Sequence, residues 1–220
     1  KIIIAADFDG VITDPHGLML EILQRYGYEL ADISPFQPDH QNTLEVMQRQ
    51  KPGRSRQDIK DDYRAMIKEC YIDRLNEVPL APGAAEVLPR WRKLPYVSFF
   101  NVTSREDSPL CMELKALSRY FQQMEITVNG VINTSNTNKR PALIHLAPVI
   151  FTDDSYNKLQ DIFDDPQCTC LDPRLQNTAI ALFRNQGNRN IRPAGLIQTI
   201  ENGWWGLDLK VREIAKKSGY

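Results

Sequence analysis

A short apolar run near the start of the chain constrains the fold more than any other feature. Residues Ile2 to Ala6 are continuously apolar and rich in isoleucine, and Asp7-Phe8-Asp9-Gly10 follows at once. A run of this length without polar alternation is typical of a strand buried on both faces, as in a parallel sheet covered by helices. Gly10 suits the sharp turn that must follow. The sequence therefore predicts two carboxylates where a buried parallel strand ends.

The rest of the chain alternates between strand-like and helix-like patterns. Further strands are predicted over 96–102, 124–128, 149–152 and 178–183. Helices are predicted between and after them, over 84–92, 108–121, 156–163 and 209–217, with a packed aromatic corner at 203–206. This alternation predicts an α/β fold with a Rossmann-like parallel sheet.

Residues 15–80 differ from the rest because their patterns are helical only. Apolar residues recur at helical spacing over 18–30, around 44–47 and over 56–75, and a polar stretch containing Pro35 and Pro38 separates the first two. We therefore expect a core domain of residues 1–14 and 81–220, with a mostly helical cap domain of residues 15–80 inserted after the first strand.

The composition is that of an ordinary globular protein, with 42% hydrophobic residues. Lys and Arg total 27 against 28 for Asp and Glu, so we expect no nucleic-acid partner. No apolar run approaches the roughly 20 residues of a membrane-spanning helix. The four cysteines suggest reduced thiols and not a disulfide framework, which favours a cytoplasmic protein. The chain begins with Lys, so a removed targeting signal stays open, as does the oligomeric state.

Polar side chains follow three of the predicted strands. In open α/β sheets, binding sites lie beyond the carboxyl ends of the strands, where the strand order reverses. Acids and hydroxyls at several such ends therefore indicate one shared site. The residues are Asp7 and Asp9, Thr103 and Ser104, and Asp153 and Asp154.

Four carboxylates at one edge would repel one another unless a cation lay between them. A hard divalent ion with oxygen ligands resolves this repulsion, and Mg²⁺ suits an open site because it accepts one or two carboxylates together with waters and phosphate oxygens. Lys139, in the loop before the Asp153 strand, can bring a positive charge to the same edge. Acids, metal, hydroxyl and lysine together predict a phosphoryl-transfer site.

These residues resemble the four motifs of the haloacid dehalogenase superfamily. Asp7-Phe8-Asp9-Gly10-Val11 is similar to its first motif, Thr103 to its second, Lys139 to its third and Asp153-Asp154 to its acidic fourth. Leu80-Ala81-Pro82-Gly83 resembles the segment that returns to the core after a helical cap in the phosphoglycolate-phosphatase-like branch. The resemblance extends to about residue 183. Asp153 stands where the family often has Gly, and no Lys-Pro pair marks the third motif, so Lys158 is the other candidate lysine.

The resemblance implies a role for each residue. Asp7 would be the nucleophile that forms an aspartyl-phosphate, and Asp9 the general acid and base. Mg²⁺ would be held by Asp7, the backbone carbonyl of Asp9 and Asp154, with Asp153 as a ligand or its neighbour. Phosphate oxygens would be bound by Thr103, Ser104 and Lys139.

The expected function is therefore a Mg²⁺-dependent phosphomonoester hydrolase, acting on a small phosphorylated metabolite beneath the cap. Three alternatives remain open. A phosphoprotein phosphatase, acting on phosphotyrosine, would need an open cap. A phosphomutase would return the phosphoryl group to its substrate. A non-catalytic binding protein on the same fold would be expected to lack an essential acid.

Each motif taken alone also has a structural interpretation. Asp-Phe-Asp-Gly can be a surface turn, although its spacing does not fit a calcium-binding EF-hand loop. Thr103-Ser104 and Asp153-Asp154-Ser155 can cap helices, and Lys139-Arg140 can be solvated charge. Arg54 and Arg56, in a turn-rich loop of the expected cap, either bind a substrate anion or form an exposed loop tip.

Overall fold

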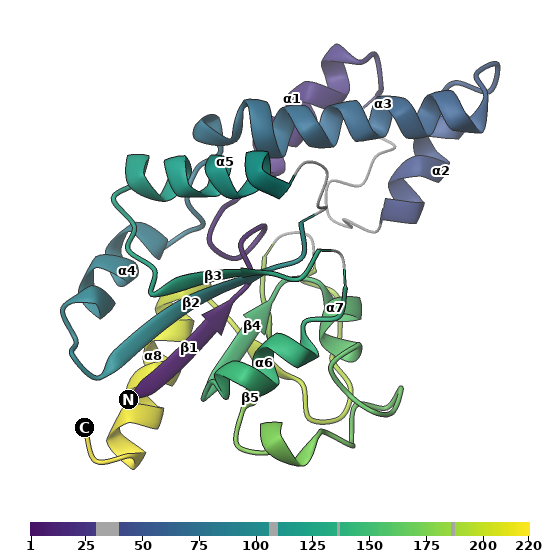
Figure 1. Cartoon of the computed structure of the whole chain (residues 1–220). Helices are drawn as coiled ribbons and strands as arrows, with labels where there is room; N and C mark the ends of the chain where they lie inside the picture. Colours follow the sequence, from purple (N-terminus) through teal and green to yellow (C-terminus); the bar gives the residue numbers. More distant parts are fainter. Residues whose placement is uncertain (30–39, 106–109, 136, 186–187) are drawn as a thin grey trace.

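The computed structural model describes residues 1–29, 40–105, 110–135, 137–185 and 188–220. Six parallel strands form one sheet in the order β3-β2-β1-β4-β5-β6 (Figure 1). The strands are β1 (Ile2–Ala6), β2 (Val97–Thr103), β3 (Gly130–Asn133), β4 (Ile150–Asp153), β5 (Ala179–Phe183) and β6 (Gln198–Ile200). The expected α/β fold with a parallel sheet is confirmed, and the strand order reverses between β1 and β4.

Helices cover both faces of this sheet (Figure 1). The helices α4 (Ala84–Arg92), α5 (Leu110–Gln123) and α8 (Gly203–Lys217) lie on one face, and α6 (Arg140–Leu146), α7 (Tyr156–Gln160) and the short 3-10 helix η3 (Pro173–Leu175) on the other. The β1 side chains alternate accordingly: Ile2, Ile4 and Ala6 join the first core, and Ala5 joins the second. An apolar run buried on both faces is what this arrangement requires.

The strand expected over 124–128 is wrong. The backbone N–H groups of Met124 and Ile126 donate to the carbonyls of Tyr120 and Phe121, each at 2.9 Å, and so close the end of α5. Between them Glu125 has a φ of 54°, the left-handed conformation that commonly ends helices. The strand β3 begins only at Gly130, because helix termination overrides the local β-propensity of this segment.

Two further differences concern the C-terminal region. The expected aromatic corner is the first turn of α8, in which Trp204 is fully buried and Trp205 is 51% exposed. The strand β6 was not predicted, because three residues in a polar context carry too little pattern. The helix over 84–92 is confirmed within its expected bounds, whereas the expected start of the next helix, at Ser108, lies outside the described residues.

A helical layer lies beyond the carboxyl ends of the strands (Figure 1). It contains α1 (His16–Arg25), α2 (His40–Gln50), α3 (Arg56–Lys68), the π-helix η1 (Glu69–Asp73) and the 3-10 helix η2 (Leu75–Glu77). The expected polar stretch with Pro35 and Pro38 falls outside the described residues. Among the helices of the described ranges, none combines the length and the apolarity that crossing a membrane requires.

Two short chain segments connect this helical layer to the sheet, and they pair with each other. The N–H of Asp14 donates to the carbonyl of Pro79 at 2.9 Å, and the N–H of Ala81 donates to Ile12 at 2.9 Å, on either side of an antiparallel bridge between Thr13 and Leu80. The expected domain boundaries, after residue 14 and after residue 80, fall within this pair of segments.

Within the helical layer, the loop before α3 is held by its own contacts. Ser55 and Asp58 form a reciprocal capping box at the start of α3. The guanidinium of Arg54 pairs with Asp62, which also accepts the hydroxyl of Tyr28 at 2.8 Å. Arg54 therefore has a structural partner within the layer, whereas Arg56 is exposed at the first position of α3.

An indole ring ties the loop after β1 to the last helix of the chain. Trp204 of α8 is fully buried and packs edge-on against Trp91 and Phe99. Its Nε1 donates a 2.7 Å hydrogen bond to the carbonyl of Val11. A buried carbonyl that accepts a directed hydrogen bond holds its loop in one position, so the loop carrying Asp7 and Asp9 is anchored from below by α8.

We predict that Trp204→Phe lowers the free energy of unfolding by about 1–3 kcal/mol, because it leaves the buried carbonyl of Val11 unsatisfied. Equilibrium unfolding in urea measures this loss. The matched control is Trp205→Phe, which changes an exposed ring in the same helix turn and should leave stability within about 0.5 kcal/mol of the unsubstituted protein. Equal losses in the two variants would contradict the prediction.

Candidate functional site

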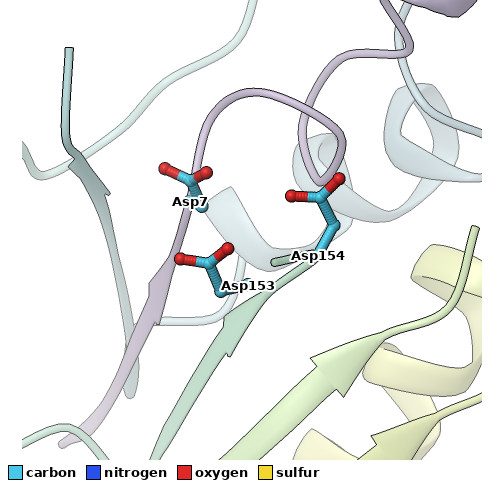
Figure 2. Close-up of side chains that lie close together, drawn as sticks. All are labelled: Asp7, Asp153 and Asp154. Atoms are coloured by element: carbon cyan, nitrogen blue, oxygen red, sulfur yellow. The ribbon is translucent and has the colours of Figure 1, made fainter. Parts of the chain in front are cut away.

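Carboxylates from two neighbouring strands meet at the carboxyl edge of the sheet. Ala6 of β1 pairs with Thr152 of β4, so Asp7 and Asp153 stand side by side at the ends of these strands. The N–H of Asp7 donates to Thr152 at 2.9 Å and extends this pairing. Asp7, Asp153 and Asp154 each offer an oxygen, and these three oxygens lie within 4.8 Å of one another (Figure 2).

Lys139 brings a buried positive charge between two of these acids. It precedes α6, its side chain is 2% exposed, and its Nζ lies 2.7 Å from Oδ1 of Asp7 and 2.7 Å from Oδ2 of Asp153. Burial lowers the pKa of Lys139, but the two carboxylates outweigh burial and raise the pKa above its ordinary value. The lysine is therefore charged, and the structure places Lys139 and not Lys158, which lies in α7, against the expected nucleophile.

Lys139 does not neutralise the cluster completely. The pKa of Asp7 is raised to about 7, because burial and the charges of Asp153 and Asp9 together outweigh the lowering effect of Lys139. Burial and the neighbouring acids also raise the pKa of Asp154 well above its usual range. The sheet edge therefore carries more negative charge than its lysine balances.

The surplus charge fits a hard divalent cation. Oδ1 of Asp7 contacts Lys139 as an ion pair, but it has no directed hydrogen bond from any residue in the described part of the chain. A divalent cation that prefers oxygen ligands could share this carboxylate and would offset the charge that Lys139 leaves unbalanced. The residues that can hold such a cation are Asp7, Asp153 and Asp154.

The carboxylate of Asp154 is held from two sides. Nδ2 of Asn185 donates to Oδ2 of Asp154 at 2.9 Å, and Nδ2 of Asn188 donates to the Asp154 carbonyl at 2.8 Å. On the other side, a Cβ added to Gly10 would lie 2.0 Å from Oδ2 of Asp154. Gly10 therefore serves both the turn, where its φ is +74°, and the space that the acid needs.

Asp9 forms an ion pair with Arg105, a residue to which the sequence motifs assign no role. Arg105, two residues after β2, donates to Oδ1 of Asp9 through Nη2 at 2.8 Å and to Oδ2 through Nε at 3.2 Å. Its third nitrogen, Nη1, donates to the carbonyl of Tyr71 in η1 at 2.8 Å. The Arg105 side chain is 7% exposed, so this contact between the sheet edge and the helical layer is buried.

The two hydroxyl residues after β2 lie at the same edge. Thr103 is 1% exposed, and its carbonyl accepts the N–H of Thr134 at 2.8 Å. The hydroxyl of Ser104 is 2.9 Å from the hydroxyl of Thr134. Ser104 thus has a hydrogen-bond partner in the segment after β3, and its expected role in phosphate binding stays a prediction.

The structural interpretation of Asp153-Asp154-Ser155 accounts for only part of the motif. Ser155 is the N-cap of α7, and its Oγ accepts the N–H of Lys158 at 3.5 Å. Asp153 accepts the N–H of Ser155 at 2.9 Å with one oxygen and contacts Lys139 with the other. The side chain of Asp154 makes neither contact and faces Gly10 and Asn185, so capping does not explain its position.

A cavity of about 490 Å³ borders the site on the β5 side. It reaches Gly10 and Asn185, which lie beside the carboxylate of Asp154, and extends to Asp14, Pro82 and Trp205. The clustered acids themselves do not line this cavity, which is separated from Asp154 by Gly10 and Asn185.

The sequence patterns point to the acids and the lysine but not to the residues that contact them. Arg105 follows the recognised Thr103-Ser104 pair directly, so its position at a strand end was the available signal. Asn185 follows β5 in the same way, two residues after its last residue. An amide or guanidinium at a strand end carries less information than an acid, because such side chains are common in polar loops.

We predict that Gly10→Ala removes about 1–2 kcal/mol of stability through its left-handed backbone alone and also displaces the carboxylate of Asp154. Urea unfolding measures the first effect, and calorimetric titration with Mg²⁺ measures the weaker cation binding that should accompany it. Gly17→Ala is the matched control, because Gly17 lies in α1 with nothing within 4 Å of its added Cβ. Unchanged Mg²⁺ binding in Gly10→Ala would contradict this description of the site.

Solved structures with the same architecture are similar to this chain over nearly its whole length, although no protein-family model and no curated protein matches its sequence. A haloacid dehalogenase-like protein from Agrobacterium tumefaciens aligns with a TM-score of 0.57 at 13% identity, covering 97% of this chain and 98% of that one. A HAD-superfamily hydrolase of subfamily IA from Geobacter sulfurreducens gives 0.52 at 17% identity, covering 94% and 95%. A β-phosphoglucomutase from Clostridium difficile gives 0.52 at 14% identity, covering 96% and 97%.

At these identities the likeness shows the fold and not the activity. This fold is the one that the resemblance of the sequence motifs implies. The chain has the fold of the haloacid dehalogenase-like hydrolases.

Proposed function

We propose that this protein is a Mg²⁺-dependent phosphomonoester hydrolase that acts through an aspartyl-phosphate on Asp7. The observation that carries the proposal is the cluster of Asp7, Asp153 and Asp154, in which Asp7 and Asp153 both contact the buried ammonium of Lys139. A nucleophilic carboxylate, a buried cation and room for a divalent ion are the parts that phosphoryl transfer requires.

In the first step, a carboxylate oxygen of Asp7 attacks the phosphorus of the bound ester. The bond between phosphorus and the ester oxygen breaks, and Asp9 donates a proton to the departing oxygen, which leaves as an alcohol. Lys139 favours this step because its charge lies 2.7 Å from Asp7 and lowers the pKa that burial raises, which favours the ionised nucleophile.

In the second step, water hydrolyses the aspartyl-phosphate. Asp9, now a carboxylate, accepts a proton from the attacking water while the bond between phosphorus and the Asp7 oxygen breaks. Inorganic phosphate leaves, Asp7 returns as a carboxylate and Asp9 is protonated again. The two steps together consume one ester and one water and produce one alcohol and one phosphate.

Asp7, the backbone carbonyl of Asp9 and Asp154 would hold Mg²⁺, with Asp153 as a ligand or its neighbour. When bound, Mg²⁺ supplies positive charge that offsets the charge of the phosphoryl oxygens and of the acids. Thr103 and Lys139, with Ser104 beside them, would contact phosphate oxygens. Asn185 and Gly10 support this arrangement because they restrict the carboxylate of Asp154.

The helical layer of residues 15–80 would act as a cap over a core of residues 1–14 and 81–220. The paired segments at 12–14 and 79–81 are suited to a hinge, because both connections lie side by side. A cap that closes over the sheet edge excludes water and favours small substrates, so a small phosphorylated metabolite is proposed over a phosphoprotein.

A phosphomutase is the second candidate, and it would use the same residues. It would differ only in the acceptor, since the phosphoryl group on Asp7 would return to a hydroxyl of the substrate instead of passing to water. The likeness in fold to a β-phosphoglucomutase motivates this candidate. Release of stoichiometric inorganic phosphate from a sugar phosphate supports the hydrolase, whereas an isomeric sugar phosphate without phosphate release supports the mutase.

The decisive experiment is hydrolysis of an aryl phosphate by the purified protein, with Mg²⁺ or with a chelator. We expect turnover only with Mg²⁺, and a loss of at least about 1,000-fold in Asp7→Asn because the nucleophile is removed. Asp61→Asn, an acid on the exposed side of α3, is the matched control and should retain full activity. Turnover that survives in Asp7→Asn would overturn the assignment of the nucleophile.

The raised pKa of Asp7 predicts how stability depends on pH without metal. Because the pKa rises from 3.8 to about 7 on folding, the folded protein binds more protons than the unfolded chain in that window. This contribution therefore lowers the stability as pH rises from about 4 to about 7, and no further above it. We expect the chelated protein to melt at a lower temperature at pH 8 than at pH 5.5.

Mg²⁺ should reverse this loss, because it binds the ionised carboxylates of the folded state. The increase in melting temperature on adding Mg²⁺ should therefore be larger at pH 8 than at pH 5.5. In Asp7→Asn, which cannot ionise at this position, both the pH effect and the response to Mg²⁺ should shrink. An equal response to Mg²⁺ at both pH values in the unsubstituted protein would contradict a cation site built on Asp7.

A further inference from the structure

Arg105 makes contacts that a merely structural arginine would not need. Its guanidinium engages both oxygens of Asp9, at 2.8 and 3.2 Å, and also the carbonyl of Tyr71, at 2.8 Å. The same group lies 4.8 Å from the ring centroid of Phe8 and 5.3 Å from that of Tyr71. One buried side chain thus touches the acid, the residue before it, and the helical layer above.

The contact with Arg105 fixes both the position of the Asp9 carboxylate and the plane in which it lies. An arginine that pairs through two nitrogens aligns the carboxylate with its own planar fork, whereas a lysine acts as a point charge and leaves the carboxylate free to rotate. The two aromatic rings restrict the guanidinium further. The carboxylate of Asp9 therefore has its orientation set by Arg105.

The contact with Tyr71 makes this orientation depend on the helical layer. Tyr71 belongs to the π-helix η1, which lies between α3 and the returning segment at 79–81. A shift of η1 relative to the sheet would break or strain the bond from Nη1 to the Tyr71 carbonyl, and the same rigid guanidinium would then move against Asp9. The position of the cap and the orientation of Asp9 are connected through one side chain.

We propose that Arg105 is a positioning residue that orients the carboxylate of Asp9 and couples this orientation to the placement of the cap. The inference rests on the proposed function, in which Asp9 transfers the proton to the departing oxygen. A small displacement of the Asp9 carboxylate would lower the reaction rate, because proton transfer requires hydrogen-bond contact with the reacting oxygen.

The test uses the dependence of kcat/KM on the leaving group. An alkyl phosphate needs a proton on its departing oxygen, whereas 2,4-dinitrophenyl phosphate releases an anion that is stable without one. We expect Arg105→Met, which keeps the apolar length of the side chain, to lower kcat/KM for the alkyl ester roughly 10- to 100-fold more than for the dinitrophenyl ester. Arg105→Lys should recover part of this difference.

Two further variants separate positioning from general damage. Asp9→Asn should show the same selective loss, and adding Arg105→Met to Asp9→Asn should not increase it, because Arg105 acts through Asp9. Arg25→Ala is the matched control, since Arg25 pairs with Glu69 in the same π-helix but makes no contact with Asp9 in the structure. Arg25→Ala should change kcat/KM for the two esters by the same factor. An equal loss for both esters in Arg105→Met would overturn the positioning role.

Hydrogen exchange followed by mass spectrometry tests the coupling without turnover. Arg105→Met should accelerate exchange in residues 69–81, which include η1 and the returning segment, and leave α8 unchanged. Unchanged exchange in residues 69–81 would overturn the coupling to the cap. If the unsubstituted protein hydrolyses neither ester, both the proposed function and the role of Arg105 in proton transfer are overturned. The exchange measurement still decides whether Arg105 connects the helical layer to the sheet.

Discussion

The ammonium of Lys139, held between two carboxylates at the end of a parallel sheet, is the interaction on which the candidate site depends. Buried like charges a few ångströms apart repel, and an isolated carboxylate buried near β1 would be expected to protonate. Lys139 contacts Asp7 and Asp153 at 2.7 Å each and so allows two acids to share one edge. The third acid, Asp154, does not pair with this lysine, and a divalent cation at the same place would balance its charge.

The fold supports this edge from both layers of helices. On one face, the indole of Trp204 binds the carbonyl of Val11 and holds the loop that carries Asp7 and Asp9. On the other face, α6 begins beside Lys139 and brings the lysine back to the sheet. Because parallel strands all end at one edge, these separate anchors act on a single site.

The surroundings of the two acids in the first motif differ in a way that suits different tasks. Asp7, the proposed nucleophile, lies against Lys139 and its neighbouring acids, where the fixed cation lowers a pKa that burial raises. Asp9 lies between the sheet and the helical layer and is held by Arg105, so the proposed proton transfer would respond to the position of the proposed cap. Asp7 and Asp9, two positions apart in the chain, thus contact two different parts of the molecule.

The sequence alone determined the parallel α/β core and the acids, because a doubly buried strand and a carboxylate at its end leave patterns that are local in the chain. It also singled out Lys139, although local pattern did not distinguish this lysine from Lys158. Only the tertiary structure placed Lys139 between Asp7 and Asp153. It also ended α5 next to the segment 124–128, where a strand was expected, and brought Arg105 to Asp9. These outcomes depend on contacts between residues far apart in the chain, and such contacts leave no periodic signal in the sequence.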